Sequence, residues 1–319
     1  MRQRGARRRH MPPRQRAQRQ PECDNNEMDQ DRFELELSPA TGDATDDAAD
    51  SARRFGGLDR LYGDGAAARL RAAHVAVVGL GGVGSWTVEA LARSGIGALT
   101  LIDLDHISES NVNRQIHALT ETLGQSKALA MAERVAAINP DCAITVVDDF
   151  VTPDNVAEVL AERYTAIVDC ADQAAAKIAM IVHARGAKTP LILCGGAGGK
   201  TDPLALRAGD LSEAVNDALL AKLRNTLRRY HGYPRNVDAN NKALKRVPKM
   251  GVRALWFDQQ VVLPDAWQSD TQAPAGMAPQ GLSCAGYGSV VTVTASIGLA
   301  AANMALQLAL RQPPPAPTA

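Results

Sequence analysis

Short apolar runs that end at glycine or aspartate recur through the middle of the chain. One run, H-V-A-V-V, begins at His74 and stops at Gly79, a second, A-L-T-L-I, stops at Asp103, and a third, A-I-V-D-C, spans 166–170. Aliphatic and β-branched runs of this length, bounded by turn residues, are typical of buried strands in a parallel sheet. The segment between the first two runs predicts a helix over 83–94. Strands that alternate with helices predict an α/β fold with a doubly wound, mostly parallel, Rossmann-like sheet.

Two longer apolar patterns follow in a C-terminal extension of this fold. The segment 218–230 predicts an amphipathic helix with an inward stripe of leucines: Leu219, Leu220, Leu223 and Leu227. The stretch 290–310 has no charged residue and approaches membrane-spanning length, but it contains threonine, asparagine and glutamine. We therefore expect a long buried helix, or a strand followed by a helix, and no stable membrane insertion. Membrane association through this stretch is the alternative.

The formal net charge of zero conceals an uneven distribution. Residues 1–20 carry eight arginines and no acid, whereas 21–50 carry eleven acids and one arginine. Like-charged segments with few large apolar residues cannot offset the entropy of ordering, so 1–50 is predicted to be a disordered charged tail. Two alternatives stay open: the first twenty residues form an RNA-binding arm, or translation starts at Met11 or Met28.

A second concentration of charge lies between Lys222 and Arg253, which holds ten basic residues and one acid, Asp238. Such a patch binds phosphates largely without sequence preference. The candidate RNA contacts are Arg228, Arg229, Lys245 and Arg246. A solvated basic face is the alternative, and Tyr230 and Tyr233 either stack on bases or pack internally.

The turn after the first strand contains G-x-G-x-x-G. Gly79, Gly81 and Gly84 lack the side chains that would keep backbone amides and a helix N terminus away from a phosphate, and Gly82 lies between them. The motif alone fits NAD, FAD or another nucleotide, or a tight turn without a ligand. Asp103, 19 positions past Gly84, suits hydrogen bonding to ribose hydroxyls.

A polar cluster just after Asp103 argues against a dinucleotide dehydrogenase. Its members are Asn111, Asn113, Arg114 and Gln115, and Lys127 begins a predicted helix farther on. Because ligands of open α/β sheets bind beyond the carboxyl ends of strands, we expect Gly82, Asp103, Asp169 and Asp172 to converge there. Cations and a carboxylate beside a phosphate-binding loop indicate chemistry at phosphorus, with the carboxylate holding magnesium.

The five cysteines include no C-x-x-C pair, so a structural zinc site is not expected. An odd number of cysteines without a secretory signal indicates a reducing, cytoplasmic compartment. Cys170, Cys194 and Cys284 follow predicted strands or lie near a glycine-rich turn. Small buried thiols are favoured over a thiol that accepts sulfur or forms a thioester.

Together these residues resemble the ubiquitin-activating-like adenylating superfamily, which includes the ThiF- and MoeB-type activators of sulfur carriers. The matching elements are G-L-G-G-V-G-S at 79–85, D-x-D at 103–105, N-x-N-R-Q at 111–115, Lys127 and D-x-x-D at 169–172. Within it, the chain is most similar to the tRNA threonylcarbamoyladenosine dehydratases, in stretches at 54–63, 113–119, 146–156, 195–203 and 284–295. The sulfur-carrier activators usually have two C-x-x-C zinc pairs, and the lack of these pairs supports the dehydratase branch.

The resemblance implies an ATP-dependent, ligase-type, AMP-forming enzyme that dehydrates N6-threonylcarbamoyladenosine in tRNA to a cyclic form. The carboxylate of the modified base would attack the α-phosphorus of ATP, pyrophosphate would leave, and the carbamoyl group would capture the acyl adenylate intramolecularly. An adenylating activator of a ubiquitin-like sulfur-carrier protein is the alternative. An NAD-binding module is disfavoured by the polar cluster and Lys127.

The resemblance also implies residue roles. The nucleotide contacts would be Gly79, Gly81, Gly82, Gly84, Asp103, Asp105, Asn111, Asn113 and Gln115. The catalytic residues would be Arg114, Lys127, Asp172 and Arg60, with Asp172 holding the Mg²⁺ that accompanies ATP. Arg60 would reach the triphosphate of a partner subunit, which predicts a homodimer with composite sites. A cysteine desulfurase or a sulfur-acceptor protein stays open as a further partner.

These expectations divide the chain into four parts. After the tail at 1–50, residues 51–208 are predicted to form the adenylating domain. Residues 209–311 are predicted to carry the basic tRNA-binding segment and a final strand or helix, and 312–319 a proline-rich tail.

Overall fold

The computed structural model describes residues 52–238, 240, 242, 244–263 and 287–313. The predicted tail at 1–50, the cysteines Cys23 and Cys284, and most of 312–319 lie outside the described residues.

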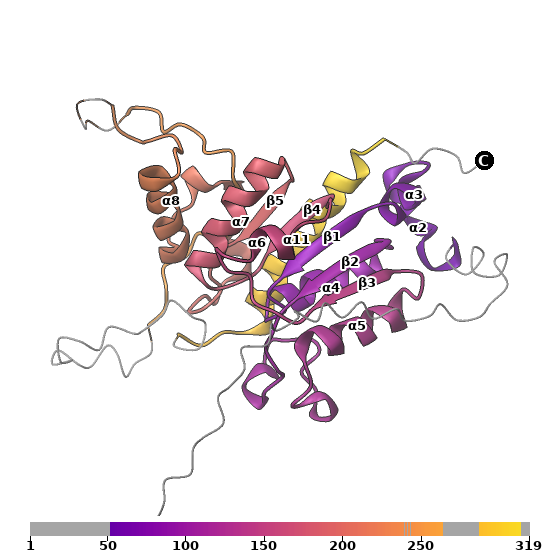
Figure 1. Cartoon of the computed structure of the whole chain (residues 1–319). Coiled ribbons are helices and arrows are strands. Elements are labelled where there is room, and N and C mark those ends of the chain that lie inside the picture. The colour runs from indigo at the N-terminus through magenta and orange to yellow at the C-terminus, as the bar shows by residue number, and fades with distance from the viewer. Residues whose placement is uncertain (1–51, 239, 241, 243, 264–286, 314–319) are drawn as a thin grey trace, which may run out of the picture. The chain divides into compact units, whose positions relative to one another are not determined.

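Strands and helices alternate along the described chain (Figure 1). The strands are β1 (His74–Val78), β2 (Ala98–Ile102), β3 (Ala143–Val147), β4 (Ala166–Asp169), β5 (Leu191–Cys194), β6 (Leu206–Asp210) and β7 (Arg253–Phe257). The helices are α2 (Gly57–Tyr62), α3 (Ala66–Arg71), α4 (Gly84–Arg93), α5 (Lys127–Ile138), α6 (Val156–Val159), α7 (Ala174–Ala187), α8 (Ala218–Tyr230) and α11 (Val291–Leu310). Single 3-10 turns span Glu109–Asn111, Thr120–Thr122, Pro203–Ala205 and Leu211–Glu213.

The described strands form one seven-stranded sheet in the order β3-β2-β1-β4-β5-β7-β6. All neighbours pair in parallel except β6, which pairs antiparallel with β7 at the edge. Val78 at the end of β1 lies beside Ile102 on β2 and Asp169 on β4. Since the strand order reverses between β1 and β4, a ligand crevice is expected at their carboxyl ends. The predicted fold class is confirmed, and residue 208, the predicted domain boundary, lies within β6.

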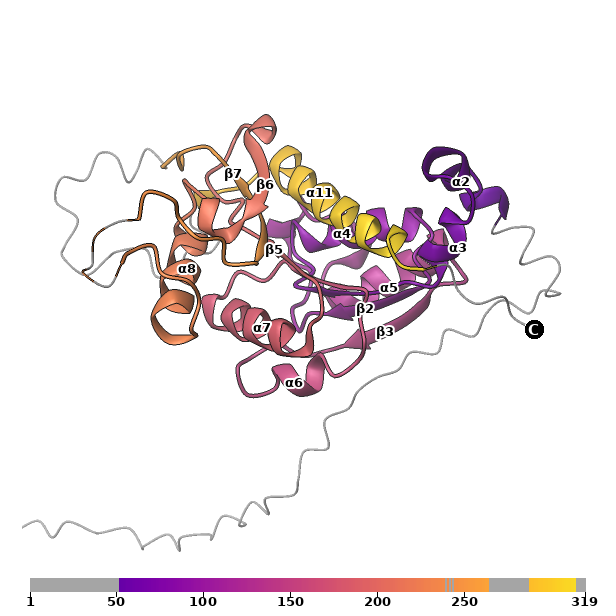
Figure 2. The same cartoon turned by 90° about the horizontal axis from the view of Figure 1, so that it is seen from above.

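Helices cover both faces of the sheet. Figure 2 shows α4 and α11 on one side and α6 and α7 on the other. α11 packs closely on α4 at Gly298. A side chain there would clash with the carbonyl oxygen of Val83, so glycine is needed for this approach. α11 is the one helix of the described chain that is long and apolar enough to cross a membrane, and 56% of its apolar stretch is buried inside the protein. The stretch 290–310 therefore forms a single helix packed against the core.

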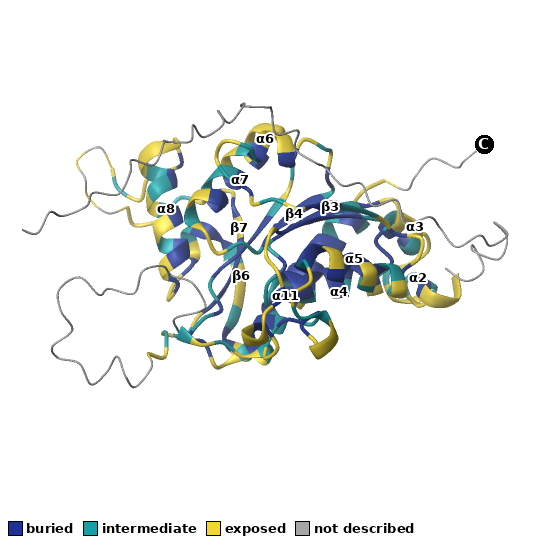
Figure 3. Cartoon of the chain, turned by 60° about the horizontal axis from the view of Figure 1, so that its bottom comes forward, coloured by how far each residue is buried: buried dark blue, intermediate teal, exposed yellow. Residues whose placement is uncertain are grey.

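The leucine pattern of 218–230 is confirmed in α8. Its four stripe leucines are buried between α7, β5 and β7, where they pack in one apolar cluster with Tyr233 and Trp256. Asp217 accepts a hydrogen bond from the Leu220 amide at 2.8 Å and so caps the helix. In Figure 3, α8 exposes its outer side, whereas α4 is mostly buried.

A buried ion pair ties the ends of β4 and β5 together. Lys177 on α7 is fully buried, and its Nζ lies 2.9 Å from Oδ1 of Asp169, which is also fully buried. The same Nζ donates to the carbonyl of Cys194 at 2.9 Å. The expectation that Asp169 converges on the ligand crevice is therefore wrong, because its carboxylate is turned into the protein to pair with Lys177.

Candidate active site

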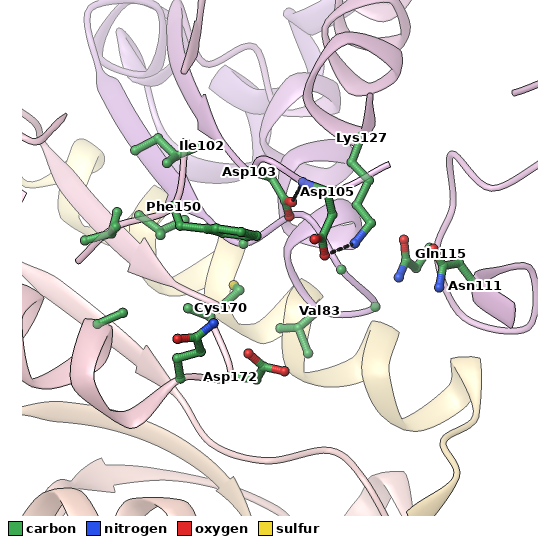
Figure 4. Close-up of a pocket in the computed structure, with 18 of the residues that line it drawn as sticks. Val83, Ile102, Asp103, Asp105, Asn111, Gln115, Lys127, Phe150, Cys170 and Asp172 are labelled. Atoms are coloured by element: carbon green, nitrogen blue, oxygen red, sulfur yellow. Dashed lines mark hydrogen bonds and ion pairs between the residues drawn. The ribbon is translucent and has the colours of Figure 1, made fainter. Parts of the chain in front are cut away.

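A crevice of about 280 Å³ opens at the carboxyl ends of β1, β2 and β4, where the strand order reverses (Figure 4). The predicted site residues that line it are Gly79, Gly81, Gly82, Asp103, Asp105, Asn111, Arg114, Gln115, Lys127 and Asp172. They come from separate segments of the chain, which meet because the strands that precede them end at the same edge of the sheet. Gly84, Asn113 and Arg60 do not line the crevice.

Two glycines make the phosphate-binding turn possible. Gly79 has a φ of +85°, and a Cβ there would lie 2.9 Å from the amide nitrogen of Ala171. A Cβ at Gly84 would overlap the carbonyl oxygen of Gly79, so only glycine lets α4 begin directly behind the turn. The nearest atom that a Cβ at Gly81 would meet is 3.9 Å away. The turn therefore forms a cradle whose inner side has room for an anion.

Asp103 fixes the shape of this turn. Its Oδ2 accepts the Leu80 amide at 2.5 Å and its Oδ1 accepts the Asp105 amide at 2.8 Å. Burial raises the pKa of Asp103 above its usual range, although Lys127 and the two amide donors oppose that shift. A carboxylate offers about four acceptor sites, so two amides leave capacity for ribose hydroxyls.

Lys127 is held at the crevice by the start of α5. Ser126 caps the helix by accepting the amide of Leu129 at 3.4 Å, and Lys127 is only 6% exposed. Its Nζ lies 2.7 Å from Oδ2 of Asp105, the pair that Figure 4 draws with a dashed line. This cation stands close to the glycine turn in a largely buried position, where charge interactions are less screened than in water.

Arg114 lies across the glycine turn. A Cβ at Gly82 would be 3.1 Å from Cγ of Arg114. The guanidinium donates to the Ser110 carbonyl at 2.6 Å and to Oδ1 of Asn113 at 2.9 Å. Asn113 in turn donates to the carbonyl of Ser289 at 2.8 Å. Asn113 thus orients Arg114 and ties it to the segment before α11.

The remaining polar lining shows one unused acceptor. Oε1 of Gln115 is buried and has no hydrogen-bond partner among the described residues. Because a buried polar atom without a partner is costly, it fits a site that a polar ligand completes. Asn111 accepts the Ser108 amide at 3.1 Å and so closes the turn that carries this segment.

Sequence reasoning missed the apolar wall of the crevice. Phe150, which is 41% exposed, faces it together with Ile102, Val151 and Ala176. This wall is suited to a flat, apolar group such as a purine base. The signal available in the sequence was the position of Phe150, one of only four phenylalanines in the chain, just after the apolar run 143–147 and two aspartates.

Of the two remaining predicted catalytic residues, Asp172 lines the crevice and Arg60 does not. Asp172 is exposed at the mouth of the crevice, in the loop between β4 and α7. The described residues contain no group of three or more His, Cys, Asp or Glu side chains placed to hold a metal. A lone carboxylate suits Mg²⁺, which usually keeps phosphate and water ligands. Arg60 is exposed on α2, away from the crevice of its own chain.

The basic segment, residues 222–253, runs from α8 toward the amino ends of the strands, opposite the crevice. α8 begins beside the carboxyl end of β5, where Asp217 accepts the Gly196 amide at 2.8 Å. Beyond the other end of α8, Tyr233 lines a second cavity of about 520 Å³ with residues that precede β5 and β7. Three cationic residues and no acidic residue are among the described residues that line this cavity: Arg185, Lys188 and Arg253. The sequence pattern did not predict this separation from the crevice.

The candidate RNA contacts differ in accessibility. Arg229, Lys245 and Arg246 are exposed, whereas Arg228 is half-buried and donates to the Pro234 carbonyl at 3.1 Å. Tyr233 is 5% exposed beneath the guanidinium of Arg185, so it packs internally. Tyr230 is 66% exposed, and the guanidinium of Arg229 lies 5.1 Å from the centroid of its ring.

The buried side chain of His117, two residues after Gln115, should make the stability of the protein depend on pH. It is 2% exposed, and its ring nitrogens have no hydrogen-bond partner among the described residues. Burial, and then the cations Lys127 and Arg134, lower its pKa to about 4. Unfolding restores a pKa near 6.5, so the unfolded chain binds more protons between these values and stability falls as the pH drops from about 6.5 to 4.

The measurement compares the wild type with His117→Gln in urea unfolding at pH 7 and pH 5. We expect the wild type to lose about 2 kcal/mol more than the variant over this interval. Equal losses in the two proteins would show that His117 does not titrate in this way.

The comparisons with known proteins agree with this geometry. The ThiF family model matches residues 57–319. The tRNA threonylcarbamoyladenosine dehydratase of Escherichia coli K12 is 45% identical over 260 residues, covering 80% of this chain and 92% of that protein. The one from Haemophilus influenzae is 39% identical, covering 82% and 94%. The crystal structure of the E. coli dehydratase TcdA in complex with ATP is similar with a TM-score of 0.68 at 42% identity, covering 80% and 93%. The chain therefore belongs to the ThiF family, within which it groups with the tRNA threonylcarbamoyladenosine dehydratases.

Proposed function

We propose that the chain catalyses the ATP-dependent dehydration of N6-threonylcarbamoyladenosine in tRNA to its cyclic form. The observation that carries the proposal is the crevice, which combines a glycine cradle, two cations and an exposed carboxylate in a chain 45% identical to a dehydratase of this kind. The oxygen lost from the modified base leaves on AMP, and pyrophosphate is the other product. The reaction is thus of the ligase type, with cleavage of ATP between its α- and β-phosphates.

ATP would bind along the lining of the crevice. The amides of the turn from Gly79 to Gly82 and the start of α4 would face its phosphates, because a helix N terminus and free amides attract anions. Asp103 would accept hydrogen bonds from the ribose, and the wall with Phe150 would contact the adenine. The crystal structure of TcdA in complex with ATP supports ATP as the ligand.

The chemical step needs charge stabilisation more than a protein nucleophile. As the substrate carboxylate attacks the α-phosphorus, negative charge grows on the departing pyrophosphate, which Lys127 and Arg114 would neutralise. Asp172 would hold the Mg²⁺ bound with ATP, which supplies further positive charge at the phosphates. The carbamoyl group of the same nucleoside then attacks the activated carbonyl, and this intramolecular capture has a high effective concentration.

A second subunit would complete the site. Arg60 does not line the crevice of its own chain and is exposed, so it is free to act on a partner's ATP. We therefore propose a homodimer in which each crevice receives Arg60 of the partner subunit.

The tRNA would contact the protein at both ends of the parallel strands, at the crevice and at a second, basic surface. The modified base enters the crevice, while phosphates of the same RNA lie on the basic surface, formed by Arg185, Lys188, Arg228, Arg229, Lys245, Arg246 and Arg253. α8, with 13 residues, spans about 20 Å between the two ends. A folded RNA is large enough to bridge that distance.

Neutralising Lys245 and Arg246 with alanine is expected to weaken tRNA binding and reduce its salt dependence. Removing one ion pair between the protein and a phosphate lowers the slope of log K against log salt by about 0.7–0.9, so the slope of the double variant should fall by between one and two units. ATP affinity should not change. Filter binding over a series of KCl concentrations measures both the affinity for tRNA and its salt dependence.

The double variant Arg93→Gln/Arg207→Gln is the control, because it removes two positive charges outside the basic surface. An unchanged tRNA affinity in Lys245→Ala/Arg246→Ala, or an equal loss in the control, would refute the proposed surface.

Pyrophosphate release tests the function against its alternative. We expect release from ATP to be stimulated by tRNA that carries threonylcarbamoyladenosine and not by the same tRNA without that modification. Stimulation by a carrier protein ending in Gly-Gly, with no response to the modified tRNA, would instead indicate a sulfur-carrier activator. The E. coli molybdopterin-synthase adenylyltransferase, 36% identical over 123 residues, makes this comparison worthwhile.

A further inference from the structure

Two thiols lie together at the crevice, one in its lining and one behind it in the core. Cys170 follows β4 and lines the crevice, as Figure 4 shows, whereas Cys194 ends β5 and is 2% exposed in the core. Their Sγ atoms are 3.9 Å apart. No step of the proposed reaction uses either thiol.

We propose that Cys170 and Cys194 form a site of reversible thiol oxidation, at which a small oxidant entering the crevice joins them in a disulfide that weakens nucleotide binding. The effect on the nucleotide rests on the proposed function, whereas the disulfide itself does not.

The sheet already holds the two backbones at a suitable distance. Asp169 on β4 lies beside Leu193 on β5, so one residue farther along the parallel pair Cys170 lies beside Cys194. Neighbouring strands are about 4.8 Å apart, and disulfides join Cα atoms about 4.4–6.8 Å apart. The sulfurs must still approach from 3.9 Å to a bond of about 2 Å. Closure therefore requires a local shift at the strand ends but no change in strand pairing.

The order of reaction follows from access. Cys170 lines the crevice, whereas Cys194 is 2% exposed behind it, so an oxidant that enters the crevice meets Cys170 first. With a small disulfide as oxidant, the Cys170 thiolate attacks one sulfur and releases one thiolate. Cys194 then attacks the Cys170 sulfur, loses its proton and releases the second thiolate. Two electrons and two protons pass from the pair to the oxidant, and a dithiol reverses the change.

The local shift of Cys170 that closes the disulfide would directly affect the glycine turn. The Cys170 amide donates to the Val78 carbonyl at 2.8 Å, just before that turn. A Cβ at Gly79 would lie 3.0 Å from the carbonyl of Cys170, and a Cβ at Gly84 would lie 3.3 Å from the Cβ of Cys170. Lys177 holds the backbone of Cys194 through its carbonyl oxygen. Movement of Cys170 toward this fixed partner therefore withdraws support from the cradle.

The pair is distinguishable from the other described thiol. Cys142 is buried just before β3, and its Sγ contacts the carbonyl of Ala143. Burial raises the pKa of Cys142 to about 12. It lies outside the crevice lining, so its replacement by alanine makes a matched control.

The test uses the full chain, reduced and then treated with diamide, which takes two electrons and two protons from a pair of thiols. Peptide mass spectrometry should find Cys170 linked to Cys194. ATP affinity, measured by calorimetry, should fall at least tenfold and return with dithiothreitol, and saturating ATP should slow the oxidation. Cys194→Ala should keep its ATP affinity after diamide, whereas Cys142→Ala should lose it as the wild type does.

Three results would overturn the proposal: no Cys170–Cys194 link, a link of Cys170 to Cys23 or Cys284 instead, or a Cys170–Cys194 link that leaves ATP affinity unchanged. A reduced chain that does not bind ATP would contradict the proposed function. The mass spectrum would then still decide whether the disulfide forms.

Discussion

Replacing Lys177 with methionine is expected to lower the free energy of unfolding by about 3–5 kcal/mol. The substitution keeps most of the side-chain volume but leaves the carboxylate of Asp169 buried without its cation. Oδ2 of Asp169 already has no hydrogen-bond partner among the described residues, so the loss is not compensated locally. Urea unfolding at pH 7, followed by circular dichroism, measures the change.

Two variants separate this effect from simple packing. Lys188→Met removes a lysine just after the same helix, where the side chain is exposed, and should change stability by less than about 0.5 kcal/mol. Asp169→Asn combined with Lys177→Met removes both charges and should recover much of the lost stability. A Lys177→Met protein as stable as the wild type would contradict the ion pair.

Replacing Arg114 with alanine is expected to slow tRNA-dependent pyrophosphate release about 10²- to 10³-fold, equivalent to about 2.7–4 kcal/mol of transition-state stabilisation. Within the described part of the chain, the guanidinium donates hydrogen bonds to its near neighbours Ser110 and Asn113, so the fold should survive its removal. ATP binding should weaken less than the rate falls, because the developing charge is greatest in the transition state. Single-turnover kinetics with saturating ATP and modified tRNA measure the effect.

Arg207→Ala is the matched control for Arg114→Ala. Like Arg114, Arg207 donates to oxygens of nearby residues, here the carbonyls of Leu204 and Leu206, but it lies on the edge strand β6 and is exposed, whereas Arg114 is half-buried. The Arg207→Ala variant should keep the wild-type rate. If Arg114→Ala also keeps the wild-type rate, Arg114 has no role in the reaction.

Local patterns were sufficient for the part of the fold that builds the crevice. The apolar run from His74 and the glycine turn after it predict β1 and α4, because both depend on residues close together in sequence. The sequence also predicted that Asp103, Lys127 and Asp172 lie at one crevice, since parallel strands bring their carboxyl ends to the same side of the sheet.

Features that depend on distant packing could not be predicted in the same way. Asp169 and Asp172 share one motif, and only the position of Lys177 on α7 decides which carboxylate is buried. The basic segment lies between β6 and β7, and β7 inserts between β5 and β6 in the sheet. Its distance from the β1, β2 and β4 ends that form the crevice depends on that strand order, which no local pattern encodes.

The proposed activity is tested most directly on the nucleoside itself. The protein is incubated with ATP and tRNA from cells that lack the cyclic modification, and the digested nucleosides are analysed by mass spectrometry. The proposed function predicts that threonylcarbamoyladenosine loses one water, that this loss requires ATP, and that Arg114→Ala slows it. Threonylcarbamoyladenosine that stays intact while the wild-type protein binds both ATP and the tRNA would contradict the proposed dehydration.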